Sequence, residues 1–296
     1  MRRSIMRQNT ASAGIRSFEE SIGKYATNHA DYFAHPDKYR LEPFCIFGNL
    51  YYVGDQRACP HLIDTGDGLI LIDTGYGHEL PYLLDNIRTL GFQPEDIKII
   101  IHTHGHYDHF GCTDTIKAIS GARVYMSRVD TQLLREMPER ALVHHSCVPN
   151  AQIPWPDVEL EDGDHIRLGN TDITCVLSPG HTFGTMSFFF DVTDGQQVLR
   201  AGYLGGAGLL TMYKAYCSWY HLPQTKCAAM KKTIQKLWHE KVDITLGNHP
   251  SQNDTLGKRK FMIENPGSNP FIDPKGWQAF LTKLEAQRAV FEELGY

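Results

Sequence analysis

Long apolar runs are absent from this chain of 296 residues. No segment reaches the roughly 20 consecutive apolar residues that a membrane-spanning helix needs, so a membrane partner is not expected. The basic residues after Met1 are not followed by the apolar centre of a secretory signal peptide either. We therefore expect a cytoplasmic protein, or a periplasmic or secreted one if a native leader has been trimmed from it.

Cysteine is scarce and has no pattern. The sequence holds seven cysteines, widely scattered and without a Cys-x-x-Cys spacing, which argues against a disulfide framework and a structural zinc knuckle. Most of them are expected to be buried thiols. One pair, Cys217 and Cys227, is close enough in sequence to close a loop, and the sequence leaves open whether these two residues pair.

A surplus of positive charge is missing as well. The chain has 29 lysines and arginines against 34 aspartates and glutamates, a formal net charge of −5, and these charges are interspersed. A nucleic-acid partner is disfavoured, because binding to nucleic acid relies on lysine and arginine contacts to phosphates. With 42% hydrophobic and 21% charged residues, the composition is typical of a globular enzyme, and a small-molecule substrate is the expected partner.

Residues 1–40 are polar and differ from the rest of the chain. Apolar residues recur there at helical spacing, which predicts a helix around Gly14–Phe33. We expect this N-terminal helical extension to serve in packing or in the association of copies of the chain as a homo-oligomer. Residues 41–296 show no linker composition and are predicted to form a single domain.

The strands of this domain indicate a sheet that is covered on both sides. Ile97–Ile101 has no polar alternation, which is typical of a strand buried on both faces. Two similar apolar segments around Asp67-Gly68 predict a hairpin, and helices are expected at Leu80–Leu90 and Trp277–Leu294. Strands followed by helices occur again after Val158. The sequence therefore predicts the α/β class, with an αβ/βα sandwich of two inner sheets and outer helices.

The densest chemical pattern directly follows the apolar strand. His104, His106, Asp108 and His109 form the sequence His-x-His-x-Asp-His, which suits a loop better than one face of a helix. Imidazole nitrogens and carboxylate oxygens are ligands for zinc, with iron, manganese or another transition metal as alternatives. His102 precedes the motif, fits no ligand position and is expected to be packed.

Two more histidines follow strands elsewhere in the chain. His181 comes after a Pro-Gly turn and His249 after Gly-Asn, the same strand-to-loop context as the motif. If these strand ends share one edge, two triads assemble, and three ligands per ion leave an open position for a catalytic water. The expected ligands of two zinc ions are His104, His106 and His181 for one, and Asp108, His109 and His249 for the other.

These segments resemble the metallo-β-lactamase superfamily. The resemblance runs from about Phe44 to the end and rests on the motif, Leu71-Ile-Asp-Thr-Gly75, Pro179-Gly-His-Thr182 and Asn248-His249. Within the superfamily, the chain most resembles the B3-like β-lactamases, whose two zinc sites use histidine and aspartate without a cysteine ligand. The resemblance implies the four-layer fold of that superfamily, hydrolysis of the β-lactam amide by a metal-bound hydroxide, and a role in antibiotic resistance.

The resemblance also assigns roles to three further side chains. Asp108 is expected to bind the second ion and to orient the nucleophile, and Asp73 to hold the metal loop. Most hydrolases of the superfamily carry an aspartate that bridges both metals, whereas this chain has Ala201-Gly202-Tyr203 at that step. Two interpretations of Tyr203 stay open: a packed aromatic, or a catalytic residue whose hydroxyl lies over the second ion.

Other functions remain alternatives at this stage. The missing signal peptide favours a metal-dependent hydrolase of another cyclic amide, a lactone or a thioester, with weak or no β-lactamase activity. A redox relative would need iron and normally the bridging carboxylate, and a binding protein would have lost metal ligands. The loop Leu142–Asp157, which contains His144, His145 and Trp155, is expected to flank the substrate.

Overall fold

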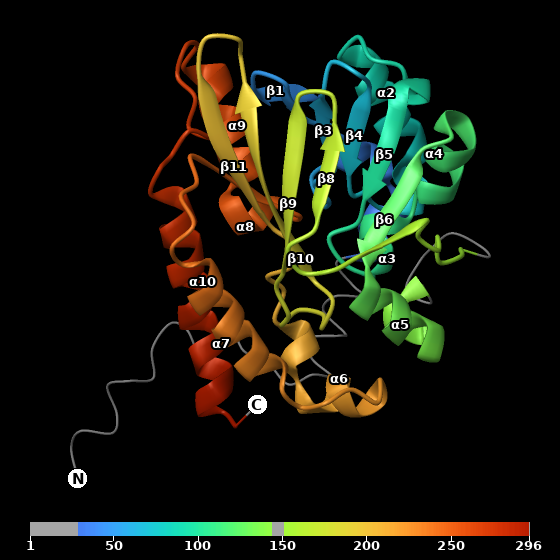
Figure 1. Cartoon of the computed structure of the whole chain (residues 1–296), viewed down its shortest axis with the longest axis vertical. Coiled ribbons are helices and arrows are strands. Elements are labelled where there is room, and N and C mark those ends of the chain that lie inside the picture. The colour runs from blue at the N-terminus through green and yellow to red at the C-terminus, as the bar shows by residue number, and fades with distance from the viewer. Residues whose placement is uncertain (1–28, 144–150, 296) are drawn as a thin grey trace.

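Two β-sheets pack face to face in the computed structural model of the chain, which describes residues 29–143 and 151–295 (Figure 1). Helices cover the outer face of each sheet, so the layers run helix, sheet, sheet, helix. This arrangement confirms the predicted αβ/βα sandwich. Most of the predicted helix Gly14–Phe33 lies outside the described residues, and residues 29–34 are helical. The homo-oligomer expected through this extension stays a prediction.

The first sheet comes from the first half of the chain and has seven strands in sequence order, β1 to β7. The strands from β1 to β4 are antiparallel and those from β4 to β7 are parallel. The predicted hairpin around Asp67-Gly68 is confirmed as β3 and β4. The strands are β1 (Phe44–Phe47), β2 (Leu50–Tyr52), β3 (His61–Asp64), β4 (Leu69–Ile72), β5 (Ile97–Ile101), β6 (Arg123–Ser127) and β7 (Val158–Leu160).

The second sheet comes from the second half and has five strands in the order β12-β11-β10-β9-β8. Its strands are antiparallel except for the parallel pair β11 and β12. The strands are β8 (His165–Leu168), β9 (Thr171–Leu177), β10 (Met186–Thr193), β11 (Val198–Leu204) and β12 (Ile244–Gly247).

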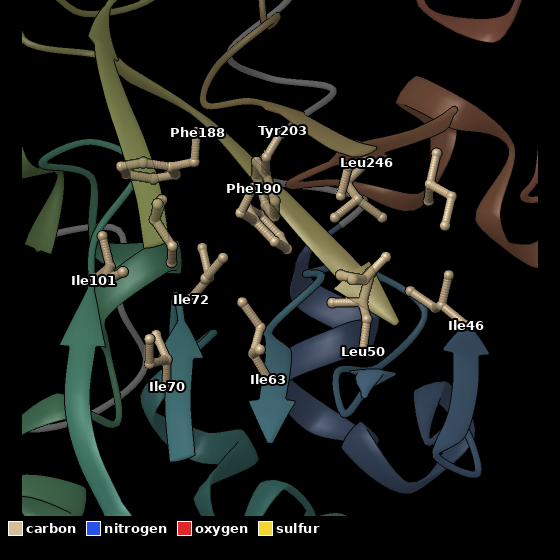
Figure 2. Close-up of a cluster of buried hydrophobic side chains, with 14 of the residues drawn as sticks. Ile46, Leu50, Ile63, Ile70, Ile72, Ile101, Phe188, Phe190, Tyr203 and Leu246 are labelled. Atoms are coloured by element: carbon tan, nitrogen blue, oxygen red, sulfur yellow. The ribbon is translucent and has the colours of Figure 1, made fainter. Parts of the chain in front are cut away.

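Alternate side chains of both sheets fill the space between them (Figure 2). Ile72 and Ile101 project from the first sheet, Phe188 and Phe190 project from the second, and all four are fully buried. Burial of side chains of this size contributes about 1.5–3 kcal/mol each. On its other face β5 buries Ile100 against helices, so it is covered on both faces, as its sequence predicts.

Helices α2 and α4 pack on the outer face of the first sheet, and α7 and α10 on that of the second. The helices predicted at Leu80–Leu90 and Trp277–Leu294 are confirmed to within one residue at each end. Sequence periodicity did not predict α6, α8 and α9, which bury few apolar side chains. The helices are α2 (Leu80–Thr89), α3 (Tyr107–Phe110), α4 (Thr113–Ser120), α5 (Arg128–Glu136), α6 (Lys214–Trp219), α7 (Lys226–Leu237), α8 (Pro250–Asn253), α9 (Thr255–Glu264) and α10 (Gly276–Glu293).

The described residues test two of the expectations from the sequence, the one about membrane-spanning helices and the one about disulfides. Among them, no helix combines the length and the apolar character that crossing a bilayer requires. Their six cysteines are all free thiols, and five are buried. Cys217 Sγ donates to Thr211 O and Cys227 Sγ to Arg288 O, each at 3.7 Å, so these two cysteines do not pair.

Several strand ends meet at one edge of the sandwich because of the strand directions. β4 and β5 are parallel, so the segments that begin with Asp73 and His102 leave the first sheet side by side. β11 and β12 are parallel too, which places the glycine-rich loop after Leu204 next to His249. This edge therefore gathers the polar segments that the sequence places after separate strands.

His61 is a buried histidine in the core, and it should make stability depend on pH. Burial lowers the pKa of His61 from its usual value of 6.5 to about 4. The unfolded chain therefore binds a proton at His61 more tightly than the folded chain does. As a result, the free energy of unfolding decreases as the pH falls from 6.5 toward 4. Between pH 7 and pH 5, we expect the free energy of unfolding of the metal-free wild type to decrease by about 2 kcal/mol more than that of metal-free His61→Phe.

Urea unfolding at the two pH values measures this difference. The exposed His239 provides the control, since His239→Phe should leave the pH dependence of the wild type unchanged. Equal losses of stability in wild type and His61→Phe would show that His61 does not contribute.

Candidate metal centre

The histidine motif begins where β5 ends. His104 and His106 lie in the loop after the strand, as expected, and both are buried. Asp108 and His109 instead lie on α3, a single helical turn, so the prediction of a loop was wrong for the second half of the motif. The turn places Asp108 and His109 next to His249, whereas the loop histidines lie next to His181.

His104, His106 and His181 form the first triad. His106 Nδ1 lies 3.1 Å from His104 Nε2 and 3.1 Å from His181 Nε2. The three rings are nearly perpendicular to one another, with interplanar angles of 85° to 90°. Three nitrogens that converge from perpendicular rings suit one metal ion with an open fourth position.

Asp108, His109 and His249 form the second triad. Asp108 Oδ2 lies 3.3 Å from His109 Nε2 and 3.4 Å from His249 Nε2. In both triads the possible ligand atoms lie within 4.8 Å of one another. The structure thus brings together all six predicted ligands, in the two predicted sets, and their donor types fit zinc. Their role as ligands remains a prediction.

Backbone carbonyls set the tautomer of three of these histidines. His104 Nδ1 donates to Gly205 O at 2.9 Å, and His181 Nδ1 donates to Gly208 O at 2.7 Å. His249 Nδ1 donates to Arg57 O at 2.8 Å. A carbonyl only accepts, so each Nδ1 carries the proton and each Nε2 presents a lone pair to the triad.

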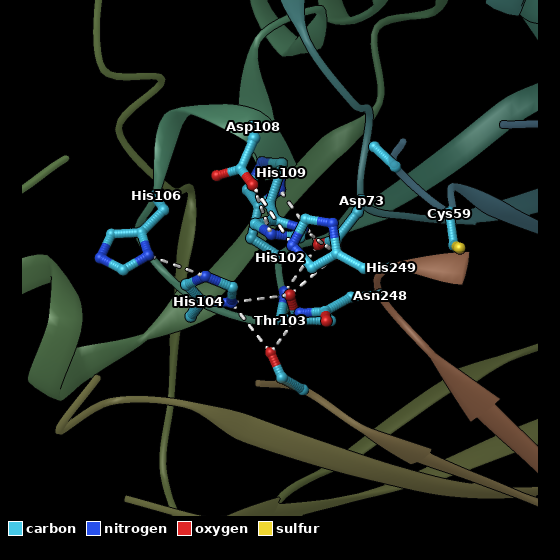
Figure 3. Close-up of polar contacts among 12 residues, drawn as sticks. Cys59, Asp73, His102, Thr103, His104, His106, Asp108, His109, Asn248 and His249 are labelled. Carbon is cyan, nitrogen blue, oxygen red and sulfur yellow. Dashed lines mark hydrogen bonds and ion pairs between the residues drawn. The ribbon is translucent and has the colours of Figure 1, made fainter. Parts of the chain in front are cut away.

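Asp73 connects the two triads, as Figure 3 shows. Its carboxylate accepts hydrogen bonds from Thr103 N, Thr103 Oγ1 and His109 Nδ1, each at 2.8 Å. Asp73 is 1% exposed. These contacts fit the predicted task of holding the metal loop, because they orient His109 and fix the backbone before His104. His102 is fully buried with Nε2 3.1 Å from Thr113 Oγ1, in line with its predicted packing role.

The charges of the two triads differ. Burial and the neighbouring histidines lower the pKa of His104 and His106 well below the usual value, so both rings are neutral. Burial also acts to lower the pKa of His109, but the carboxylates of Asp108 and Asp73 outweigh it and raise this pKa to about 10. Without a metal, the second triad therefore attracts a proton, and a cation is the natural replacement for it.

A pocket of about 470 Å³ opens over both triads. His106, Asp108, His181 and His249 contribute to its lining. The other walls are largely apolar and contain four leucines and three tyrosines. The leucines are Leu142, Leu209, Leu210 and Leu256, and the tyrosines are Tyr76, Tyr216 and Tyr220.

The loop predicted to flank the substrate is only partly described. Leu142, its first residue, lines the pocket, whereas His144 and His145 lie outside the described residues. Trp155 is 44% exposed, and the guanidinium of Arg135 lies 5.7 Å from the centre of its ring. The expected role of the loop therefore has direct support at Leu142 alone.

Tyr203 does not lie at the pocket. Its side chain is fully buried between the sheets, and its hydroxyl donates to Cys59 O at 3.2 Å (Figure 2). The ring packs edge-on against His61 and Phe188. This position favours the packing interpretation of Tyr203 over the catalytic one, because alternation along β11 turns this residue into the core.

We expect Tyr203→Phe to leave kcat/KM and zinc content within about twofold of the wild type. The lost hydrogen bond to Cys59 O should lower the free energy of unfolding by about 1 kcal/mol. Steady-state kinetics, metal analysis and urea unfolding measure the three quantities. A tenfold fall in kcat at unchanged metal content would restore a catalytic role for the hydroxyl.

Sequence reasoning missed several residues of the pocket. His29 reaches it from the N-terminal extension, Arg57 from the segment after β2, and Tyr216 from α6. Tyr216 Oη lies 3.4 Å from His106 Nε2, the ring nitrogen that faces away from the first triad. No local pattern marks these residues, because the folding of distant segments places them.

Comparisons with known proteins agree with this geometry. The family model of the metallo-β-lactamase superfamily matches residues 61–195. The metallo-β-lactamase GOB-18 from Elizabethkingia meningoseptica is 31% identical, with 85% of this chain and 92% of that one covered and a TM-score of 0.73. LRA-12, a class B3 di-zinc metallo-β-lactamase from an Alaskan soil metagenome, is 30% identical, with 86% and 95% covered and a TM-score of 0.72.

A curated relative has a different activity in its name. The hydroxyacylglutathione hydrolase GloC of Haemophilus influenzae is 28% identical over 226 residues, which are 74% of this chain and 94% of that protein. The chain belongs to the metallo-β-lactamase superfamily, and it is a metal-dependent hydrolase. Its structural neighbours include subclass B3 metallo-β-lactamases, as its sequence motifs predict.

Proposed function

We propose that this protein is a dinuclear zinc hydrolase that opens the amide bond of a β-lactam ring and so contributes to antibiotic resistance. One observation carries the proposal: the two triads are separate, and among the described residues neither shares a carboxylate with the other. Position 203, where most other hydrolases of the superfamily are expected to place a bridging aspartate, holds a tyrosine that points into the core. This ligand set favours the B3-like interpretation.

The residues of the chain divide the work between binding and orientation. The first triad would hold one zinc ion and the second triad the other. When bound, the two ions would supply Lewis-acid polarisation of a carbonyl group and a nucleophile from water near neutral pH. Asp108 lines the pocket, so its carboxylate is placed to accept a hydrogen bond from the attacking water and to orient it. The hydrogen bonds of Asp73 keep the two triads at a constant separation.

One cationic side chain in the pocket, beside the carboxylates of Asp108 and Asp254, supports a substrate with a carboxylate, which β-lactam antibiotics carry. Among the described residues of its lining, Arg57 is the one lysine or arginine. The Arg57 guanidinium lies 5.5 Å from the centre of the Tyr32 ring and 5.3 Å from that of Tyr39, which restrict its position. A restricted guanidinium loses little entropy when it pairs with a carboxylate.

A second candidate function rests on the apolar walls and on the match to GloC. Leucines and tyrosines around the pocket suit an acyl chain, and a thioester or lactone with such a chain presents the same kind of carbonyl group to the triads. Under this alternative the protein is a small-molecule hydrolase of the same type with weak or no action on β-lactams.

An assay of zinc-loaded protein separates the two candidates. Hydrolysis of a chromogenic cephalosporin is compared with that of a medium-chain lactone and a hydroxyacylglutathione thioester, with His106→Ala as the inactive control. The proposal expects kcat/KM for the cephalosporin of at least about 10⁴ M⁻¹s⁻¹, in the range of efficient enzymes. A lactone or thioester preferred more than 100-fold over the cephalosporin would replace it with the alternative.

A further inference from the structure

Asp130 joins the two loops that carry the first triad, although it belongs to neither. It lies in the first turn of α5 and is 3% exposed. Asp130 Oδ2 accepts hydrogen bonds from Gly105 N at 2.9 Å and from Thr182 Oγ1 at 2.8 Å, and Oδ1 accepts one from Gly184 N at 2.8 Å. Gly105 separates His104 from His106, and Thr182 follows His181. One carboxylate therefore bonds to both loops.

Two glycines permit this close approach. A Cβ atom at Gly184 would lie 2.5 Å from Asp130 Oδ1 and 2.3 Å from Ser127 Oγ. A Cβ atom at Gly105 would lie 2.8 Å from Leu134 Cδ1 of the same helix. A side chain at Gly184 would push its loop away from α5, whereas one at Gly105 would require the end of the Leu134 side chain to move.

A buried lysine supports the same loop from the other side. Lys226, at the start of α7, is 2% exposed, and its Nζ donates to the carbonyl oxygen of His181 at 2.6 Å. Thr211 Oγ1 donates to the same oxygen at 2.6 Å. Burial of two charges is costly unless their hydrogen bonds are satisfied, and both groups direct theirs to the segments that carry ligands.

We propose that Asp130 is a positioning residue that fixes His181 relative to His104 and His106 and thereby sets the geometry of the first metal site. The proposal rests on the two-metal site of the proposed function, but it does not depend on which substrate is cleaved. Its effect acts through loop positions, because Asp130 itself lines no part of the substrate pocket.

Cobalt titration of the metal-free full chain tests this role, because the visible absorption of Co²⁺ reports ligand geometry directly. In Asp130→Asn, an amide replaces one acceptor oxygen with a donor, so one of the backbone N–H groups loses its partner. We expect about 10- to 100-fold weaker Co²⁺ binding and an altered spectrum at the first site, the usual effect of losing an outer partner of metal ligands. The second site should keep its affinity within threefold.

Three further variants keep the result interpretable. Asp162→Asn is the matched control, since Asp162 accepts from Leu177 N and Lys236 far from the triads, and it should bind Co²⁺ like the wild type. Ile116→Val destabilises a helix elsewhere by about 1 kcal/mol and should leave the spectrum unchanged. If Asp130→Asn fails to fold, Thr182→Val removes one of the three donors and should shift the same band by a smaller amount.

The outcomes separate this role from the function. The positioning role alone is overturned if the wild type binds two Co²⁺ ions and Asp130→Asn has the same Co²⁺ affinity and spectrum as the wild type. Equal losses of Co²⁺ affinity in Asp130→Asn and Ile116→Val also overturn it, because they indicate a general loss of stability. Wild-type protein that binds no metal overturns both this role and the proposed hydrolase.

Discussion

Metal-free protein is expected to hydrolyse its substrate at least about 1000-fold more slowly than zinc-loaded protein, because polarisation by a metal contributes several kcal/mol to such reactions. The structure gives the reason: the first triad consists of neutral imidazoles, and burial keeps the pKa of His181 at about 3. Neutral rings without a metal offer no positive charge to a developing oxyanion. Rates measured after chelation and after the return of two zinc equivalents per chain check this prediction.

Thermal unfolding of the same samples provides the control. Zinc that binds only the folded chain should stabilise it by about 2.7 kcal/mol at a free concentration 100 times the Kd. Full activity in protein with less than 0.1 zinc per chain would contradict a metal mechanism.

Replacement of His106 by alanine should reduce kcat/KM more than about 100-fold. Loss of an outer hydrogen-bond partner alone reduces metal affinity or activity 10- to 100-fold, and His106 is expected to supply a ligand atom itself. Its Nδ1 is equidistant from the nitrogens of His104 and His181, so its removal leaves two ligands for the first ion. Steady-state kinetics together with zinc content per chain measure the effect.

His165→Ala is the matched control for this variant. His165 is exposed on β8, where its Nδ1 contacts Asp172 at 2.7 Å, and its loss should leave kcat/KM unchanged. A His106→Ala protein with wild-type kcat/KM and two bound zinc ions would show that the ligand assignment is wrong.

The two triads contribute different chemistry to one site. The first contains only neutral imidazoles, so an ion held there would keep its full charge for a carbonyl oxygen. The second contains Asp108 and is supported by Asp73, and these two carboxylates would partly neutralise an ion held there. An ion with lower net charge suits the task of orienting a nucleophile and releasing the product. This division agrees with the roles that the motif and its resemblance predict.

Outer contacts explain why so many buried polar groups surround the site. Asp73 and Asp130 each bond to segments that carry ligands, and three carbonyl oxygens set the histidine tautomers. A metal site whose predicted ligands follow three separate strands, β5, β9 and β12, has no local rigidity of its own. These contacts supply it, at the cost of burying charge in the interior.

Much of the fold follows from local sequence properties. The largely apolar segment Ile97–Ile101 forms a strand in the interior, and Leu80–Leu90, with apolar residues on one face, forms an amphipathic helix. Both follow from backbone periods of 2 and 3.6 residues. The six predicted ligands are also recognisable locally, since each of their segments follows an apolar strand. Parallel strand pairs then bring those ends to one edge.

Tertiary structure alone decided the rest. Whether Tyr203 faces the core or the site depends on the side of β11 from which it projects, and its neighbours do not reveal that side. The pocket combines His29, Arg57 and Tyr216 from segments far apart in the chain. Asp130 acts through its hydrogen bonds to two loops that are distant from its own helix in the sequence. Metal ligands can be predicted from the sequence because chemistry restricts their residue types. The shape of a pocket and the position of a supporting carboxylate arise only when distant segments pack.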